Sequence, residues 1–209
     1  MPLALASSWE VPAIRLPSFN CRSRGEYRVR LVILGGPGAG KGTQGKQLCR
    51  HLNIPWISTG EIFRAAIADK TSLGLQSAPF VEKGELVPDT IAIELIRERL
   101  TQPDAKDGWL LDGYPRTAFQ AEELDFLLDD LGQRLDWAIW IDVPVSVLMS
   151  RSLERSRADD RPEIVRRRID LFHQRTIPIT EYYEPRQKLL RIDGDRPPEL
   201  VAQNLLEAL

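Results

Sequence analysis

A glycine-rich run directly after a short apolar stretch is the feature that most constrains this chain. Residues 28–34 read Arg-Val-Arg-Leu-Val-Ile-Leu, and residues 35–43 read Gly-Gly-Pro-Gly-Ala-Gly-Lys-Gly-Thr. A strand, a glycine turn and a helix in this order let several backbone N–H groups surround one anion, because glycine has no Cβ. Lys41 would reach the outer oxygens of a phosphate chain at the positive end of the helix dipole. We therefore expect a phosphate-binding loop here.

The position after the lysine departs from the general phosphate-loop pattern. Gly35, Gly40 and Lys41 satisfy Gly-x4-Gly-Lys, but Gly42 stands where serine or threonine is usual. The hydroxyl comes one place later, at Thr43, so its usual contact with Mg²⁺ is not assured. A glycine turn that binds no ligand is the alternative, although the preceding strand and the lysine favour the phosphate loop.

The composition is typical of a soluble globular protein. The chain has 209 residues, of which 43% are apolar and 28% are charged, and its formal net charge is −2. No run approaches the ~18 apolar residues of a membrane span, so we expect no membrane partner. The net charge is slightly negative, and the sequence contains no platform of aromatic and basic residues, so we expect no nucleic acid as a partner. The two cysteines, Cys21 and Cys49, form no Cys-x-x-Cys pair, which favours a reducing compartment.

The first 26 residues differ from the rest of the chain. They contain three prolines, few acids and three arginines, and they show no helical or strand period. We interpret residues 1–26 as a disordered extension without a function, ahead of one globular unit over residues 27–209. The expected location is the cytoplasm. An organelle transit peptide, and hence a plastid location, is the alternative.

Short apolar segments alternate with helical segments from residue 29 onward, which is typical of an α/β fold with a parallel sheet. Strands are expected at residues 29–34, 56–57, 108–111, 137–143 and 189–192. Helices are expected to begin near residues 41, 60, 73, 89, 117, 145, 162 and 197. Pro178 lies inside a long helical segment, where we expect a kink or a stop. Residues 58–87 contain no strand and predict an inserted helical lobe, and residues 156–161 predict a much shorter insertion.

A second charged segment follows the strand expected at residues 108–111. Asp112 ends that strand, where it is placed to hold the water shell of a Mg²⁺ ion. Arg116 follows a glycine and a proline, and its planar guanidinium suits a phosphate. A turn with a surface arginine is the alternative. Because strand ends of an open α/β sheet share one edge, we expect both residues beside the phosphate loop.

Arginines gather between residues 151 and 168. Arg151 and Arg155 lie four residues apart on a predicted helix and share one face, and Arg157 and Arg168 follow them. Phosphoryl transfer depends on positioned cations that stabilise the transferred oxygens. Surface salt bridges, which contribute only ~0–1 kcal/mol each, are the alternative. The acids available for such pairs are Glu154, Asp159, Asp160 and Glu163.

Together these motifs resemble the adenylate kinases, which are nucleoside monophosphate kinases, from about residue 28 to the C-terminus. The segments that carry the resemblance are 38–44, 57–61 with Arg64, 84–88, 112–117 with Gln120, 157–160 and 192–194. Gly42, which is unusual in a general phosphate loop, matches this family. The resemblance implies a P-loop three-layer α/β fold with a five-stranded parallel sheet. It also implies that 58–87 is an AMP-binding lobe and that 156–161 is a short lid.

The resemblance further implies an activity. The terminal phosphoryl group of Mg-ATP would pass reversibly to AMP and give two ADP, with ATP, AMP and ADP as the only partners of a monomer. Mg²⁺ would be the cofactor, held by Asp112 through water. Some long-lid members carry a cysteine cluster that binds zinc, and the short lid of this chain predicts no structural zinc.

The site residues are also assigned by the resemblance. The ATP phosphates are expected on Gly38, Ala39, Gly40, Lys41, Gly42 and Thr43, with Arg155 over the adenine or the phosphates and Arg196 contributing through its backbone. The AMP site is expected at Thr59, Arg64, Glu85, Leu86, Val87, Gly113, Tyr114, Pro115, Arg116, Gln120, Arg157 and Arg168. The residues expected to act on the transferred phosphoryl group are Lys41, Arg116, Arg151, Arg155, Arg157 and Arg168.

Two other functions share parts of this pattern. A UMP/CMP kinase would have the same motifs, but those relatives usually carry alanine at the place of Thr59 and asparagine near Thr117. Gln120 lies one helical turn after Arg116, and its amide offers the donor and the acceptor that one edge of adenine requires. A nucleotide-binding switch without turnover would not need a second set of phosphate-binding arginines. The sequence therefore favours AMP as the acceptor.

Overall fold

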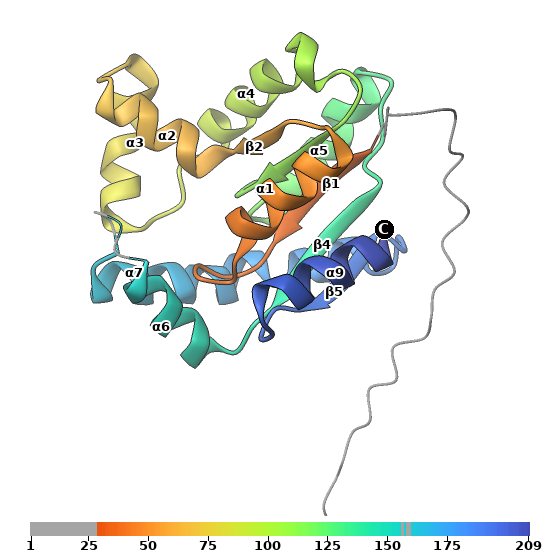
Figure 1. The fold of residues 1–209 in the computed structure, drawn as a ribbon. Helices are drawn as coiled ribbons and strands as arrows, with labels where there is room; N and C mark the ends of the chain where they lie inside the picture. The colour runs from red at the N-terminus through yellow and green to blue at the C-terminus, as the bar shows by residue number, and fades with distance from the viewer. Residues whose placement is uncertain (1–28, 156, 158–159) are drawn as a thin grey trace, which may run out of the picture.

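Five parallel strands form the centre of the molecule (Figure 1). The computed structural model describes residues 29–155, 157 and 160–209. The sheet order is β2-β3-β1-β4-β5, which confirms the expected α/β fold with a five-stranded parallel sheet. The strands are β1 (Arg30–Leu34), β2 (Trp56–Ser58), β3 (Trp109–Asp112), β4 (Trp137–Asp142) and β5 (Leu189–Asp193). Each expected strand is confirmed to within one residue at either end.

The central strands are apolar because both faces of the sheet are covered. In β1, Leu31 pairs with Leu110 of β3 on one side and with Trp137 of β4 on the other. Leu31 and Leu110 are fully buried, and so is Trp109 at the start of β3. A parallel sheet that is buried on both faces selects continuous apolar strands rather than alternating ones.

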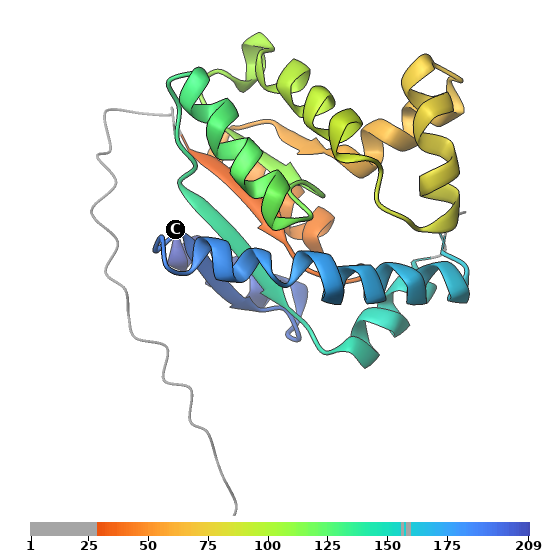
Figure 2. The same ribbon diagram turned by 180° about the vertical axis from the view of Figure 1, so that it is seen from behind.

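Helices cover the two faces of the sheet in two layers (Figures 1 and 2). One face is covered by α1 (Lys41–Leu52) and α9 (Pro198–Ala208). The other face is covered by α4 (Asp89–Leu100), α5 (Ala118–Asp130) and the segment that contains α7 (Pro162–Leu171) and α8 (Ile179–Tyr183). The short helix η1 (Pro103–Ala105) precedes β3. Each expected helix start is confirmed to within one residue.

Three helices lie beyond these layers. The helices α2 (Thr59–Ala68) and α3 (Ser72–Lys83) pack on each other and project from one side of the sheet, and α6 (Val145–Glu154) packs on α7 (Figure 1). The expected extension at residues 1–26 lies outside the described residues, as do residues 156, 158 and 159 of the expected lid. Within the described ranges, no helix has the length and apolar character needed to cross a membrane.

The long segment from α7 to α8 is interrupted, as the sequence predicted from Pro178. A π-helical turn, η2 (Phe172–Thr176), follows α7, and the N–H of Ile177 donates to the carbonyl of Phe172 at 2.9 Å. Pro178 has no N–H and its ring crowds the carbonyl four residues earlier, so the regular α-helical pattern cannot continue through it. The wider turn relieves this conflict and brings Phe172 and Thr176 toward the strand ends.

Candidate active site

The loop between β1 and α1 contains glycines at positions where a side chain would clash or the backbone has a positive φ. Gly38 has φ +81°, and a Cβ on this residue would lie 2.5 Å from the carbonyl oxygen of Leu148 and 2.7 Å from Oγ of Ser152. The loop therefore packs directly against α6. Gly40, with φ +89°, precedes α1 as its N-cap, so the first N–H groups of this helix face the space inside the loop.

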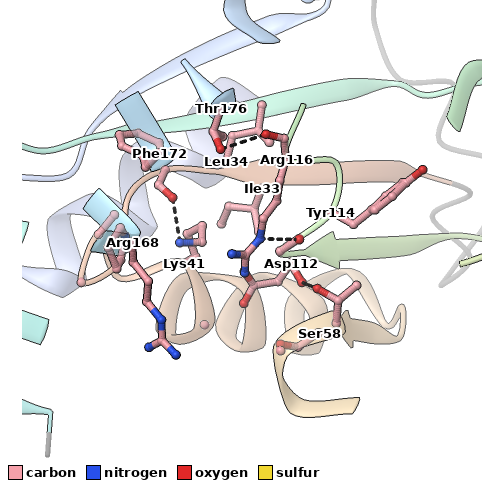
Figure 3. A pocket seen from close by; sticks show the side chains of 18 of the residues that line it. Ile33, Leu34, Lys41, Ser58, Asp112, Tyr114, Arg116, Arg168, Phe172 and Thr176 are labelled. Atoms are coloured by element: carbon pink, nitrogen blue, oxygen red, sulfur yellow. Dashed lines mark hydrogen bonds between the residues drawn. The ribbon is translucent and has the colours of Figure 1, made fainter. Parts of the chain in front are cut away.

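Lys41 spans this loop with its ammonium group (Figure 3). Its Nζ donates to the carbonyl oxygen of Gly35 at 2.8 Å and to that of Gly36 at 2.9 Å. Burial lowers the pKa of Lys41 from 10.5 to about 8, and Asp112 opposes this shift while the nearby arginines reinforce it. The ammonium therefore lies among other cations, in a place that an anion would stabilise.

Asp112 is the carboxylate of this region, at the carboxyl end of β3. It is buried, and desolvation raises its pKa, while Lys41, Arg116 and Arg157 act in the opposite direction. Gly42 lies next to this carboxylate: a Cβ on it would be 3.8 Å from Oδ2 of Asp112. Because glycine has no side chain, the space beside the carboxylate stays open.

The room beside Asp112 suits a hard cation. A carboxylate oxygen beside a phosphate loop fits Mg²⁺, which keeps several waters when few protein ligands are offered. In the part of the chain that the structure describes, no group of three or more histidine, cysteine, aspartate or glutamate residues could hold a metal. A magnesium ion here would therefore depend on water and phosphate for most of its ligands.

Arg116 is held by three hydrogen bonds, which join it to its own loop, to α5 and to η2. Its N–H donates to Oε1 of Gln120 at 2.8 Å, and its Nε donates to the carbonyl of Gly113 at 2.8 Å. Oγ1 of Thr176 donates to the carbonyl oxygen of Arg116 at 3.0 Å (Figure 3). Burial lowers the pKa of Arg116, Asp112 opposes this effect, and further arginines reinforce it. A partly buried guanidinium among other cations is a strong site for an anion.

The turn that leads to Arg116 requires glycine at position 113. Gly113 has φ +90°, and a Cβ there would lie 2.6 Å from Oγ1 of Thr59. Thr59, at the start of α2, donates in turn to the backbone carbonyl of Asp112 at 3.3 Å. The first residues of α2 and the segment after β3 are therefore packed together, which explains why both contribute to one site.

A second group of arginines surrounds Asp160. Arg155 binds this carboxylate with two hydrogen bonds of 2.9 and 2.7 Å, and Arg168 binds it at 3.3 Å. The backbone N–H of Arg157 donates to the same side chain at 3.3 Å. The Asp160 side chain is only 1% exposed. Pairing with Asp160 was expected at the protein surface, so the structure corrects that alternative: the partner is buried.

The remaining arginines lie at the rim. Arg151 donates to the carbonyl of Gly194 at 2.9 Å and pairs with Asp195 at 3.4 Å. Arg196 pairs with Asp193 at 2.7 Å. Both contacts place these arginines beside the end of β5, on the side of the phosphate loop.

These groups line one cleft of about 700 Å³. The same cleft is lined by every residue that the sequence assigned to the site. The loop after β1, the start of α2, the turn after α3, the segment after β3 and the ends of α6 and α7 each form part of its wall. Glu85 in the turn after α3 also pairs with Arg167 of α7 at 2.7 Å, and this guanidinium lowers the pKa of the Glu85 carboxyl. That pair connects the turn after α3 with α7.

Several lining residues were not expected from the sequence. They include Gln44, Trp56, Phe172 and Thr176. Gln44 continues the phosphate-loop motif and donates to the carbonyl of Pro198, so its position next to the motif was the available signal. Phe172 and Thr176 lie in the π-turn, and only their place shortly before Pro178 could have indicated them. Trp56 offered no signal beyond its position in a predicted strand.

Comparison with known proteins agrees with this geometry. The family model described as adenylate kinase matches residues 33–188. Adenylate kinase 2 of Nostoc sp. strain PCC 7120 is 61% identical over 181 residues, which cover 87% of this chain and 98% of that protein. Adenylate kinase 2 of Synechocystis sp. strain PCC 6803 is 50% identical over 181 residues, 87% of this chain and 100% of that protein. The chain therefore belongs to the adenylate kinase family.

Proposed function

We infer that this protein catalyses the reversible transfer of the terminal phosphoryl group of Mg-ATP to AMP, which gives two ADP. Family membership and the relatives named adenylate kinase support this activity. The observation that carries it is the convergence of two kinds of anion-binding group in one cleft. The phosphate loop with Lys41 lines the cleft, and so do the guanidinium-bearing residues Arg64, Arg116, Arg157 and Arg168. Direct transfer between two bound nucleotides requires this arrangement.

The ATP phosphates are proposed to bind at the phosphate loop. The ammonium of Lys41 now donates to two loop carbonyls, and a phosphate oxygen is a stronger acceptor than either of them. Gly38 to Thr43 would supply backbone N–H groups, and Arg155 and Arg196 would contact ATP from the rim. When bound, Mg²⁺ would neutralise charge on the phosphate chain, with Asp112 holding it through water.

AMP is proposed to bind on the opposite side of the cleft. Arg64 and Arg116 would hold its phosphate, and Arg116 is already fixed in direction by its backbone and side-chain hydrogen bonds. Gln120 would contact the base. The other residues proposed to line the AMP site are Thr59, Glu85, Leu86, Val87, Gly113, Tyr114, Pro115, Arg157 and Arg168.

The transfer itself needs no nucleophile from the protein. An in-line displacement passes the phosphoryl group directly, and its charge spreads over the equatorial oxygens. Lys41, Arg116, Arg157 and Arg168 are proposed to stabilise that charge, with Arg151 and Arg155 completing the set. Because water would otherwise accept the phosphoryl group, the cleft must also exclude it.

Two segments are proposed to provide this exclusion. Residues 58–87 would form the AMP-binding lobe, which is supported by the projection of α2 and α3 from the sheet beside the cleft (Figure 1). Residues 156–161 would form a short lid, which is supported by their position between α6 and α7, two helices that both contribute arginines to the cleft.

A monomer in the cytoplasm is the proposed working form, with a plastid as the alternative location. One chain supplies both anion-binding sides of the cleft, so the chemistry requires no second copy. The buried thiol of Cys49 suits a reducing compartment. Sequencing the N-terminus of the mature protein from its source would separate the two locations.

The test of the proposed function is a coupled assay that follows ADP from ATP with AMP, CMP or UMP as acceptor. We expect the highest kcat/KM with AMP. A higher value with UMP or CMP would identify a pyrimidine nucleotide kinase of the same fold. If no acceptor yields ADP, the kinase proposal fails and a nucleotide-binding switch becomes the better account.

A further inference from the structure

Gln120 is almost fully buried yet forms part of the cleft wall. Its side chain and backbone together are 2% exposed, and it lines the cleft next to Arg116. It is the third residue of α5, and its N–H donates to Oγ1 of Thr117, which caps the helix, at 3.1 Å. The backbone is therefore fixed, and the direction of the side-chain amide decides what the cleft presents to a base.

Two neighbours set that direction chemically. The backbone N–H of Arg116 can only donate, so the atom 2.8 Å from it must be the amide oxygen, Oε1. The carboxylate of Asp89 accepts only, so the atom 2.6 Å from its Oδ1 must be the amide nitrogen, Nε2. Reversing the amide would place an oxygen against the carboxylate and an NH₂ group against the N–H. Both hydrogen bonds would be lost at once.

The fixed amide leaves one donor and one acceptor in a fixed order. A primary amide has two N–H donors and two acceptor sites on oxygen, and each neighbour uses one. The remaining pair complements a purine that carries an amino group beside an unprotonated ring nitrogen. A purine with a carbonyl beside a ring N–H presents the opposite order. The direction of this amide is therefore a selectivity device.

We propose that Asp89 is a positioning residue that determines base selectivity by holding the Gln120 amide in the direction that accepts a 6-aminopurine. This inference rests on the proposed function, in which Gln120 faces the AMP base. Asp89 begins α4, 31 residues before Gln120, and is not among the described residues that line the cleft. It therefore acts through Gln120 rather than by touching the substrate.

A purely structural role for Asp89 predicts a different outcome. An acid in the first turn of a helix is favoured by the helix dipole, so loss of Asp89 could merely weaken α4. Glu199 also lies in the first turn of its helix, α9, and is exposed outside the cleft. Glu199→Gln therefore serves as the matched control for the loss of a helix N-terminal charge.

The experiment compares AMP with inosine monophosphate, a 6-oxopurine, as phosphoryl acceptor. For Asp89→Ala, the ratio of the two kcat/KM values should fall about tenfold or more, because a hydrogen bond to a charged group is lost. The change should appear mainly in KM for AMP, with KM for ATP unchanged. Asp89→Asn, which can accept or donate, should lie between wild type and Asp89→Ala. Glu199→Gln should leave the ratio unchanged.

A double substitution tests whether Asp89 acts through Gln120. In a Gln120→Ala background, Asp89→Ala should cause no further change in the AMP to inosine monophosphate ratio. An unchanged ratio in the single Asp89→Ala variant, or an equal additional loss in the double variant, would overturn the inference. These outcomes require a wild-type enzyme that phosphorylates AMP, so a wild type without that activity would instead refute the proposed function.

Discussion

The phosphate loop and the arginine group around Asp160 offer an anion two physically different kinds of binding group. In the loop, the binding groups belong to the backbone, and Gly38 packs so closely on α6 that only one conformation fits. In the arginine group, Arg155 and Arg168 already share a buried carboxylate. The loop therefore presents backbone donors in one sterically fixed arrangement, whereas the arginine group already holds an internal acid with which a bound phosphate would compete.

This difference predicts which kind of substitution should impair the phosphate loop and which should impair the arginine group around Asp160. A backbone site depends on steric fit, so the added volume of one methyl group should damage it. A side-chain site depends on charge balance, so removing one charge should alter affinity and stability in opposite directions. Arg116 combines both features, because its guanidinium donates to the backbone carbonyl of Gly113, while its own backbone N–H and carbonyl are held by Gln120 and Thr176.

The largest effect is expected for Arg116→Ala. We expect kcat to fall about 10³-fold, the lower range for an arginine that stabilises a transferred phosphoryl group. The unfolding free energy should fall by only about 1 kcal/mol, since the side chain makes one hydrogen bond among the residues that the structure describes. Steady-state kinetics and thermal unfolding measure both. Arg134→Ala, an exposed control, should change neither. Comparable losses of activity and stability would make Arg116 a structural residue.

The next effect is expected for Gly38→Ala, which tests the steric side of the comparison. The new Cβ would lie 2.5 Å from the Leu148 carbonyl oxygen at a positive φ, so we expect a loss of about 3 kcal/mol of unfolding free energy. ATP affinity should fall in parallel. Gly132 has φ +64° and no atom within 4 Å of a Cβ, so Gly132→Ala should cost only about 1 kcal/mol. Denaturant titration distinguishes them, and equal losses would contradict the proposed packing constraint.

A smaller effect is expected for Asp160→Asn, which tests the charge-balance side. Loss of the shared carboxylate should lower the unfolding free energy by about 2 kcal/mol, because hydrogen bonds to a charged group are lost in a mostly buried place. ATP affinity should stay constant or rise, since the competing anion is gone. Glu163→Gln, in an exposed pair with Arg161, should change neither quantity. A fall in ATP affinity as large as that of Gly38→Ala would show that the two sides do not differ.

The smallest effect concerns pH. Lys41 has a lowered pKa of about 8, so the fraction that is protonated falls about tenfold between pH 7 and pH 9. ATP affinity measured by calorimetry should fall by up to that factor as pH rises through 8. The unfolding free energy should change in the opposite direction. Between pH 8 and pH 10.5, Lys41 is protonated in the unfolded chain but mostly neutral in the folded one, so the folded state gains stability as the pH rises. Lys41→Arg should flatten the affinity profile. A flat wild-type profile would mean that Lys41 does not contact ATP.

Much of the fold could be predicted from the sequence because its signals are local. The apolar run before Gly35 and the glycines after it specify a strand, a turn and a helix within fifteen residues. The strands and helix starts elsewhere follow from similar runs and from proline and glycine boundaries. Pro178 likewise predicted an interruption, although its form as a π-turn depends on how α7 packs and was not predictable.

The contacts that complete the site could not be predicted, because they join residues far apart in sequence. Asp160 looked like one acid among several in a charged segment, and only the fold shows that it is buried between Arg155 and Arg168. Asp89 and Gln120 lie on different helices, and neither position alone indicates their 2.6 Å hydrogen bond. The pattern Thr117-x-x-Gln120 is a recognisable helix-capping signature, but it does not reveal the second partner of the amide.

Calorimetric titration with a compound that joins two adenosines through a chain of phosphates tests most directly whether both anion-binding sides serve one reaction. The geometry predicts one molecule bound per chain, with affinity for both ATP and AMP abolished in the complex. Binding of two molecules per chain, or a complex that still binds AMP or ATP with unchanged affinity, would contradict the convergence of the two sides on one phosphoryl group.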